Sequence, residues 1–136
     1  MTKISSQIVG HSLSPQGDEL LSVLVTFPRI ILAELNTHRM LSKNSASSRA
    51  IPFNKMVESV QNNPFIPIAW QKEHSGMQGS VYLEPYKDAP GNCVDMWLKA
   101  RDSAVKEATN LSQYGVTKQL CNRLLEPFMW HTVLVT

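Results

Sequence analysis

A long amphipathic helix is the strongest structural signal in this 136-residue chain. Asn92 can cap its start, and Asp95 and Lys99 stand four residues apart on its polar side. Gly115 can end it by accepting a left-handed backbone. We therefore expect one helix over residues 92–114, with a single stripe that turns inward: Val94, Trp97, Leu98, Arg101, Ala104, Val105, Ala108 and Leu111.

Strands are predicted near both ends of the chain. Pro15 and Gly17 mark a turn, and residues 19–27 after it have the length and β-branched content of a strand. Residues 5–27 should therefore form a hairpin or two edge strands. The apolar run over residues 128–136 predicts a further strand.

Three further segments have local signals. Pro28 suits the first turn of a helix that we expect to reach about residue 41, and residues 53–60 are amphipathic. Thr117 can cap a helix that lasts until Glu126, with Leu120, Leu124 and Cys121 inward and Arg123 on the polar side. Residues 61–90 lack periodicity and contain four prolines, which predicts a long irregular segment, either a functional loop or a simple excursion.

Charge and composition exclude several classes of function. The net charge of +2 gives no long-range attraction to DNA, RNA or an anionic membrane. No apolar run is long enough for a membrane span, the first residues lack the apolar block of a signal peptide, and Cys93 and Cys121 fit reduced thiols, so we expect a cytoplasmic protein. The histidines lack metal-ligand spacing, so no metal is expected, and no motif supports a side-chain nucleophile.

Residues 37–49 contain two arginines, a histidine, an asparagine and four serines. Guanidinium groups grip phosphate through paired hydrogen bonds, and serine hydroxyls complete a shell around the remaining oxygens. Arg49 with Ser47 and Ser48 could hold a phosphate, and Arg123 could approach from a separate helix. From the residues alone this is an anion-binding or nucleotide-binding segment, with an ordinary solvated loop as the alternative.

This stretch resembles the signature of the flavin-dependent thymidylate synthases, also called the ThyX or thymidylate-synthase-complementing family. Two positions differ: Thr37 stands where the family has an arginine, and Ser48 replaces a usual glycine. A second patch, from Gly115 through Arg123 to Pro127, resembles a helix of this family that carries a substrate-binding arginine. The amino-acid sequence is most similar to that of divergent phage-type members. The residues that match the signature in register are His38, Arg39, Ser42, Asn44, Ser47 and Arg49.

The resemblance implies an α+β fold, with a small antiparallel or mixed sheet packed with long helices, and a homotetramer. It implies methylation of dUMP to dTMP with methylenetetrahydrofolate as carbon donor and FAD, reduced by NADPH, as hydride source. By this resemblance the flavin would be held by His38, Arg39, Ser42 and Asn44, and dUMP by Ser47, Ser48, Arg49 and Arg123.

Members of this family have a longer C-terminal part than this chain. We therefore expect residues 1–136 to form a single domain that is the N-terminal portion of a longer catalytic domain. The alternative is a catalytically inactive module that binds a nucleotide or another anion. Thr37 in place of the arginine favours that alternative.

Overall fold

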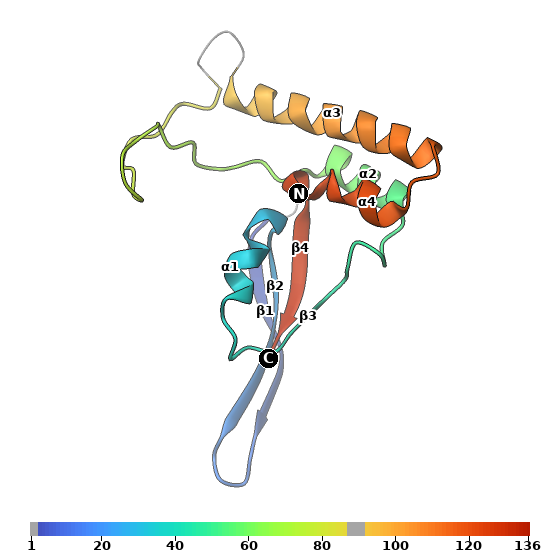
Figure 1. Cartoon of the computed structure of the whole chain (residues 1–136). Coiled ribbons are helices and arrows are strands. Elements are labelled where there is room, and N and C mark those ends of the chain that lie inside the picture. Colours follow the sequence, from blue (N-terminus) through green and yellow to red (C-terminus); the bar gives the residue numbers. More distant parts are fainter. Residues whose placement is uncertain (1–2, 87–91) are drawn as a thin grey trace.

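The computed structural model describes residues 3–86 and 92–136. It confirms the α+β class: an antiparallel sheet of order β1-β2-β4-β3 extends away from a layer of helices (Figure 1). In the described part of the chain, no helix is both long enough and apolar enough to cross a membrane.

The predicted hairpin is present, formed by β1 (Ser5–Leu13) and β2 (Glu19–Pro28). Its turn is fixed by the Ser14 hydroxyl, which accepts the Asp18 amide at 3.0 Å, and by Gly17, whose φ of 93° favours glycine. Only the second half of β2 pairs with β4 (Trp130–Val135), so the tip of the hairpin projects beyond the rest of the sheet (Figure 1).

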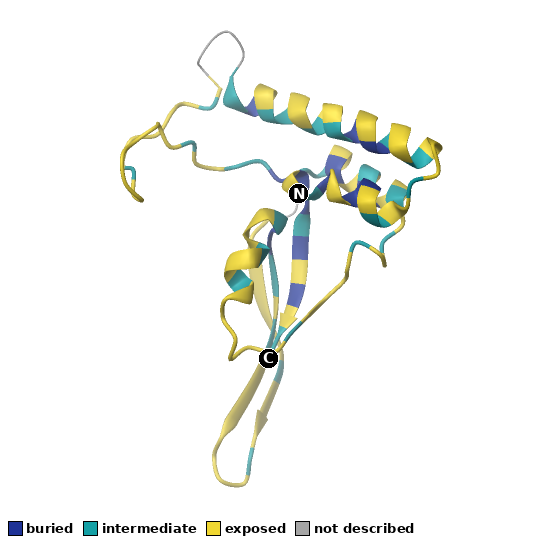
Figure 2. Ribbon diagram, in the orientation of Figure 1, coloured by how far each residue is buried: buried dark blue, intermediate teal, exposed yellow. Residues whose placement is uncertain are grey.

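The helical layer contains the expected long helix, α3 (Cys93–Gln113), together with α2 (Phe53–Asn62) and α4 (Lys118–Arg123). The Asn92 side chain accepts the Asp95 amide at 2.8 Å, and Gly115 has a φ of 85°, so both predicted ends of α3 are confirmed. Figure 2 shows burial concentrated where these helices meet the start of β4. The core consists of Met56, Val60, Val105, Ala108, Leu125, Phe128 and Met129.

The helix expected over residues 28–41 is much shorter. A 3-10 turn, η1 (Arg29–Ile31), leads into α1 (Leu32–Asn36), which ends before His38. The Thr37 hydroxyl donates to the Glu34 carbonyl at 2.7 Å, and the Lys43 ammonium donates to the His38 carbonyl at 2.6 Å. These side chains satisfy carbonyl groups at the helix end, which allows the chain to turn there.

The predicted orientation of the last helix is also wrong in part. α4 ends at Arg123, and a second 3-10 turn, η2 (Glu126–Phe128), follows it. Leu120 and Leu124 are exposed, whereas Cys121 and Asn122 are fully buried. Because the helix stops early, a helical period extended to Glu126 assigns the inward face incorrectly.

The irregular segment expected after α2 is observed. In residues 63–86 the β-pairing is limited to an isolated bridge between Gln71 and Tyr82. Beside it, the Lys72 amide donates to the Val81 carbonyl, and the Leu83 amide donates to the Trp70 carbonyl. The last part of the prediction, residues 87–90, lies outside the described residues. Both cysteines are free thiols, as expected, and Cys121 is buried.

Candidate functional site

The loop after β3 (Lys43–Ser45) is fastened to α4 by a buried asparagine. Asn122 is 0% exposed, and its amide nitrogen donates to the carbonyl oxygens of Ser48 at 3.0 Å and Ile51 at 3.1 Å. One side chain therefore satisfies two backbone acceptors of a loop that is distant in sequence. This anchor fixes the backbone that carries Ser47, Ser48 and Arg49.

The residues expected to hold dUMP are brought together around α4. The Arg49 guanidinium donates through Nε to the Gln119 side-chain oxygen at 2.7 Å. Gln119 and Arg123 are four residues apart on this helix and therefore lie on the same face. Arg49 and Arg123 thus present two exposed guanidinium groups along one helix face, next to the serines of the anchored loop.

The residues expected to hold the flavin lie elsewhere. His38 and Arg39 are exposed in the turn after α1, and Ser42 exchanges two backbone hydrogen bonds of 2.9 Å with Thr136. Asn44 lies in β3, opposite Leu134. Because β3 runs antiparallel to β4, His38 and Arg39 are near the end of β4, while Ser47 is near its start. Residues 37–49 therefore form two separate groups of hydrogen-bond donors, and they do not form a single shell around one anion.

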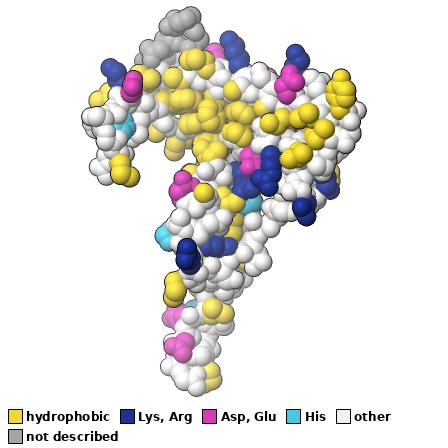
Figure 3. Space-filling model, in the orientation of Figure 1, with side chains coloured by type: hydrophobic (Ala, Val, Ile, Leu, Met, Phe, Trp, Pro, Cys, Tyr) yellow, Lys and Arg dark blue, Asp and Glu magenta, His cyan; other side chains and the backbone are white. Residues whose placement is uncertain are grey.

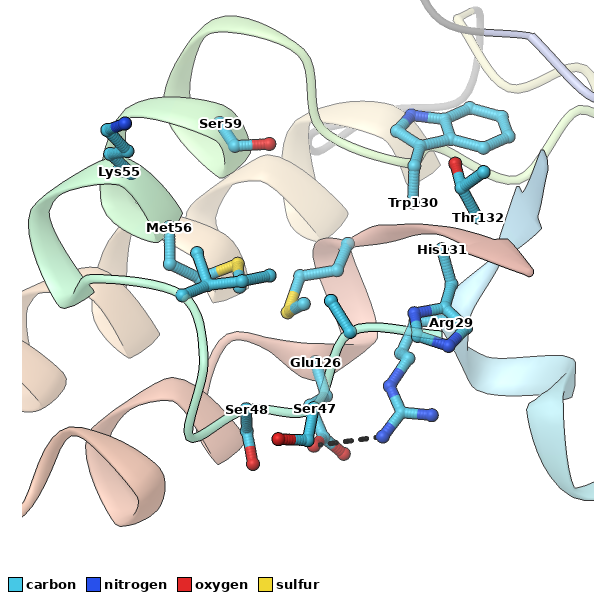
Figure 4. A pocket seen from close by; sticks show the side chains of 13 residues that line it. Arg29, Ser47, Ser48, Lys55, Met56, Ser59, Glu126, Trp130, His131 and Thr132 are labelled. Carbon is cyan, nitrogen blue, oxygen red and sulfur yellow. Dashed lines mark hydrogen bonds and ion pairs between the residues drawn. The ribbon is translucent and has the colours of Figure 1, made fainter. Parts of the chain in front are cut away.

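A cavity of about 250 Å³ lies between the anchored loop, α2 and the start of β4 (Figure 4). Ser47 and Ser48 belong to its lining, together with four residues that sequence reasoning did not single out: Arg29, Lys55, Glu126 and His131. For Glu126 the sequence does contain a local signal: it follows Arg123 by three residues, a spacing that allows an ion pair on a helix.

Glu126 joins two arginines at the edge of this cavity. Its Oε1 atom lies 3.4 Å from Nη2 of Arg29 and 3.7 Å from Nη1 of Arg123. In Figure 3, basic side chains gather beside an acidic one where the helices meet the sheet. The arrangement provides more positive than negative charge, so it suits an anion.

His131 is 8% exposed, and its Nε2 atom is buried without a hydrogen-bond partner among the described residues. Burial lowers the pKa of His131 from its ordinary value of 6.5, because the charged ring loses hydration, and the nearby Arg29 lowers it further. Glu126 opposes this shift as the smaller cause. The ring is therefore uncharged at neutral pH and can offer hydrogen bonds without adding charge.

This shift predicts a pH dependence of stability. Unfolding returns His131 to its ordinary pKa of 6.5, so below that pH the unfolded chain binds a proton that the folded chain does not. The free energy of unfolding should fall as the pH falls below 6.5, by at most about 1.4 kcal/mol per pH unit for one proton. Urea unfolding of the wild type and of His131→Gln at about pH 7.5 and about pH 5.5 measures it. A variant with the same pH dependence as the wild type would contradict the assignment.

No model of a known protein family matches the chain, and no curated protein matches its sequence significantly. The fold, however, is similar to that of a UMP/dUMP methylase, PolB from Streptomyces cacaoi. The structure with 5-Br UMP has a TM-score of 0.68 and 16% identity over 99% of this chain and 72% of the methylase chain. The structure with 5-Br dUMP has a TM-score of 0.58 and 16% identity over 98% and 73%. The chain shares the fold of this methylase.

Within residues 3–86 and 92–136, no three His, Cys, Asp or Glu side chains lie close enough together to hold a metal ion. The donors that the chain does gather are guanidinium, hydroxyl and amide groups, which bind oxygen-rich anions.

Proposed function

We propose that the chain binds dUMP and takes part in its methylation to dTMP. The observation that carries this proposal is the placement of Arg49 and Arg123, which come from separate segments and lie along one face of α4, where Arg49 bonds Gln119. The match to the flavin-dependent thymidylate synthase signature supports it. A fold shared with a UMP/dUMP methylase supports it further.

In this proposal the protein binds and orients the nucleotide. Arg49 and Arg123 form charge-assisted hydrogen bonds to the phosphate or to a base carbonyl, and the hydroxyls of Ser47 and Ser48 bind the remaining phosphate oxygens. The Asn122 anchor keeps the loop in one conformation, so little entropy is lost when the nucleotide binds. No side chain is assigned as a nucleophile.

The flavin site is proposed for His38, Arg39, Ser42 and Asn44. Their chemistry fits the group, since an exposed guanidinium suits the diphosphate of FAD and the amide and hydroxyl suit its polar edges. When bound, FAD supplies the hydride, with NADPH as reductant and methylenetetrahydrofolate as carbon donor. All four residues are exposed in a single chain. We therefore propose that further subunits of a homotetramer shield this site from water.

The nucleotide site is tested by Arg49→Ala. Loss of a charged hydrogen bond should weaken dUMP binding by roughly 1.5–3 kcal/mol, measured by isothermal titration calorimetry. Lys106→Ala is the matched control, because it removes one exposed cation from the outer side of α3 and should leave affinity unchanged. Unchanged affinity of Arg49→Ala would remove Arg49 from the dUMP site.

A binding module without catalysis is the second candidate. It is favoured by Thr37, whose hydroxyl is already bonded to the Glu34 carbonyl and does not replace the arginine of the signature. The visible spectrum of the purified protein separates the two. A flavin band that dUMP perturbs supports the enzyme, and a colourless protein that binds dUMP supports the module.

A further inference from the structure

We propose that Arg29 binds the phosphate of the nucleotide, and that the cavity between the anchored loop, α2 and β4 receives this phosphate. This inference rests on the proposed function and adds a residue that the signature does not contain. It follows from the lining of the cavity, from the state of the Arg29 ion pair and from a buried ring nitrogen without a partner.

The lining has the chemistry of a phosphate site. It combines the cations Arg29 and Lys55 and one carboxylate, that of Glu126, with the hydroxyls of Ser47, Ser48, Ser59 and Thr132, and apolar side chains such as Met56 and Met129 complete it. Figure 4 shows the Arg29 guanidinium directed toward the end of the cavity where Ser47 and Ser48 lie. A phosphate on these serines would therefore meet Arg29 within the cavity, while Arg49 on the same loop is bonded to Gln119.

The size of the cavity fits the phosphate end of a nucleotide. Pockets that enclose whole drug-sized ligands measure roughly 300–1,000 Å³. At about 250 Å³ this cavity is smaller, so the sugar and the base would lie outside it, toward Arg49 and Arg123. The proposed division of the site between phosphate and base follows from this limit.

Among the described residues, the Arg29 guanidinium has one ion-pair partner, Glu126, and keeps further N–H donors for a ligand. Its single contact with Glu126 is 3.4 Å long, whereas strong charge-assisted pairs measure about 2.7–2.9 Å and are often bidentate. A guanidinium has five N–H donors, and Glu126 shares the same oxygen with Arg123. Among the described residues Lys55 has no ion-pair partner, so the lining carries a net positive charge.

His131 provides an independent sign of a ligand. Its Nε2 atom is one of four buried side-chain atoms without a hydrogen-bond partner among the described residues, and Figure 4 shows its ring beside Arg29 at the cavity. A buried polar atom without a hydrogen bond costs about 1–3 kcal/mol, so such atoms in folded proteins call for an explanation. An oxygen of a bound phosphate ester, or a water that it holds, would supply the missing bond.

The test is Arg29→Gln, with Lys106→Gln as the control for removing one cation. Binding of inorganic phosphate, dUMP and deoxyuridine is measured by isothermal titration calorimetry at low salt. We expect Arg29→Gln to weaken binding of phosphate and of dUMP by about tenfold or more, and to leave deoxyuridine unaffected. The control should match the wild type.

The outcomes separate this inference from the proposed function. Binding of dUMP that needs Arg49 and Arg123 but not Arg29 would overturn the inference and leave the function standing. Binding of phosphate that needs Arg29, in a protein that does not bind dUMP, would overturn the proposed function and would leave the cavity as a site for a different phosphate compound. Wild-type protein that binds no phosphate at all would also overturn the inference.

A second measurement covers the case in which Arg29→Gln does not fold. Phosphate is titrated into the wild type while the side-chain nitrogen signals of Arg29 and His131 are followed by NMR. Both signals should move together and saturate with the same dissociation constant. Signals that stay in place while phosphate binds would contradict the proposal.

Discussion

Replacing Asn122 with alanine is expected to destabilise the protein and to weaken dUMP binding at the same time. The side chain is fully buried and donates to the carbonyl oxygens of Ser48 and Ile51. Each of the two buried acceptors that loses its partner costs about 1–3 kcal/mol, so the free energy of unfolding should fall by about 2–6 kcal/mol. Urea unfolding measures this loss.

The binding effect of Asn122→Ala is measured under conditions in which the variant remains folded. Without its anchor the loop of Ser47 and Ser48 becomes mobile, and ordering it again lowers the affinity for dUMP. Asn110→Ala is the matched control, since within residues 3–86 and 92–136 the side chain of this exposed asparagine on α3 has one weak hydrogen bond, to Glu107 at 3.4 Å. An Asn122 variant as stable as this control would contradict the role of the anchor.

The second large effect is expected for Leu125→Ala. Leu125 is 0% exposed and belongs to the core that joins α2, α3 and η2. Truncating a buried leucine leaves a cavity and costs about 2–5 kcal/mol, depending on how far the surroundings relax. Thermal and urea unfolding should both show the loss.

The neighbouring leucine provides a stringent control. Leu124 is 41% exposed, so Leu124→Ala should cost less than about 1 kcal/mol. This pair also tests which side of the segment faces the core, where the sequence-based assignment was wrong. A larger loss for Leu124→Ala than for Leu125→Ala would contradict the packing described above.

Local signals explain which parts of the fold could be predicted. The ends of α3 depend on an asparagine cap and a glycine with positive φ, and both are visible in the sequence. The hairpin depends on a turn containing proline and glycine. β3 could not be found this way, because its polar residues form a strand only by pairing with β4 at the edge of the sheet.

The candidate site shows the same limit. The family resemblance assigned Ser47, Ser48, Arg49 and Arg123 to dUMP, and these residues lie around one helix. Asn122 is polar in sequence, yet it is buried because its partners come from a loop about seventy residues away. The cavity brings together Arg29, Glu126 and His131 only when the sheet and the helices are in place. Local sequence spacing therefore does not predict that these three residues share one site.

The central claim is that the anchored loop and α4 form a binding site for dUMP. Its most direct test is a titration of the wild type with dUMP, followed by the NMR signals of the Ser47 and Ser48 amides and the Arg49 and Arg123 side chains. We predict saturable shifts at these four positions in the wild type, and no shift of the Ser47 and Ser48 amides in the double variant Arg49→Ala/Arg123→Ala. Saturable shifts that survive in the double variant, or a wild type that shows none, would contradict the account.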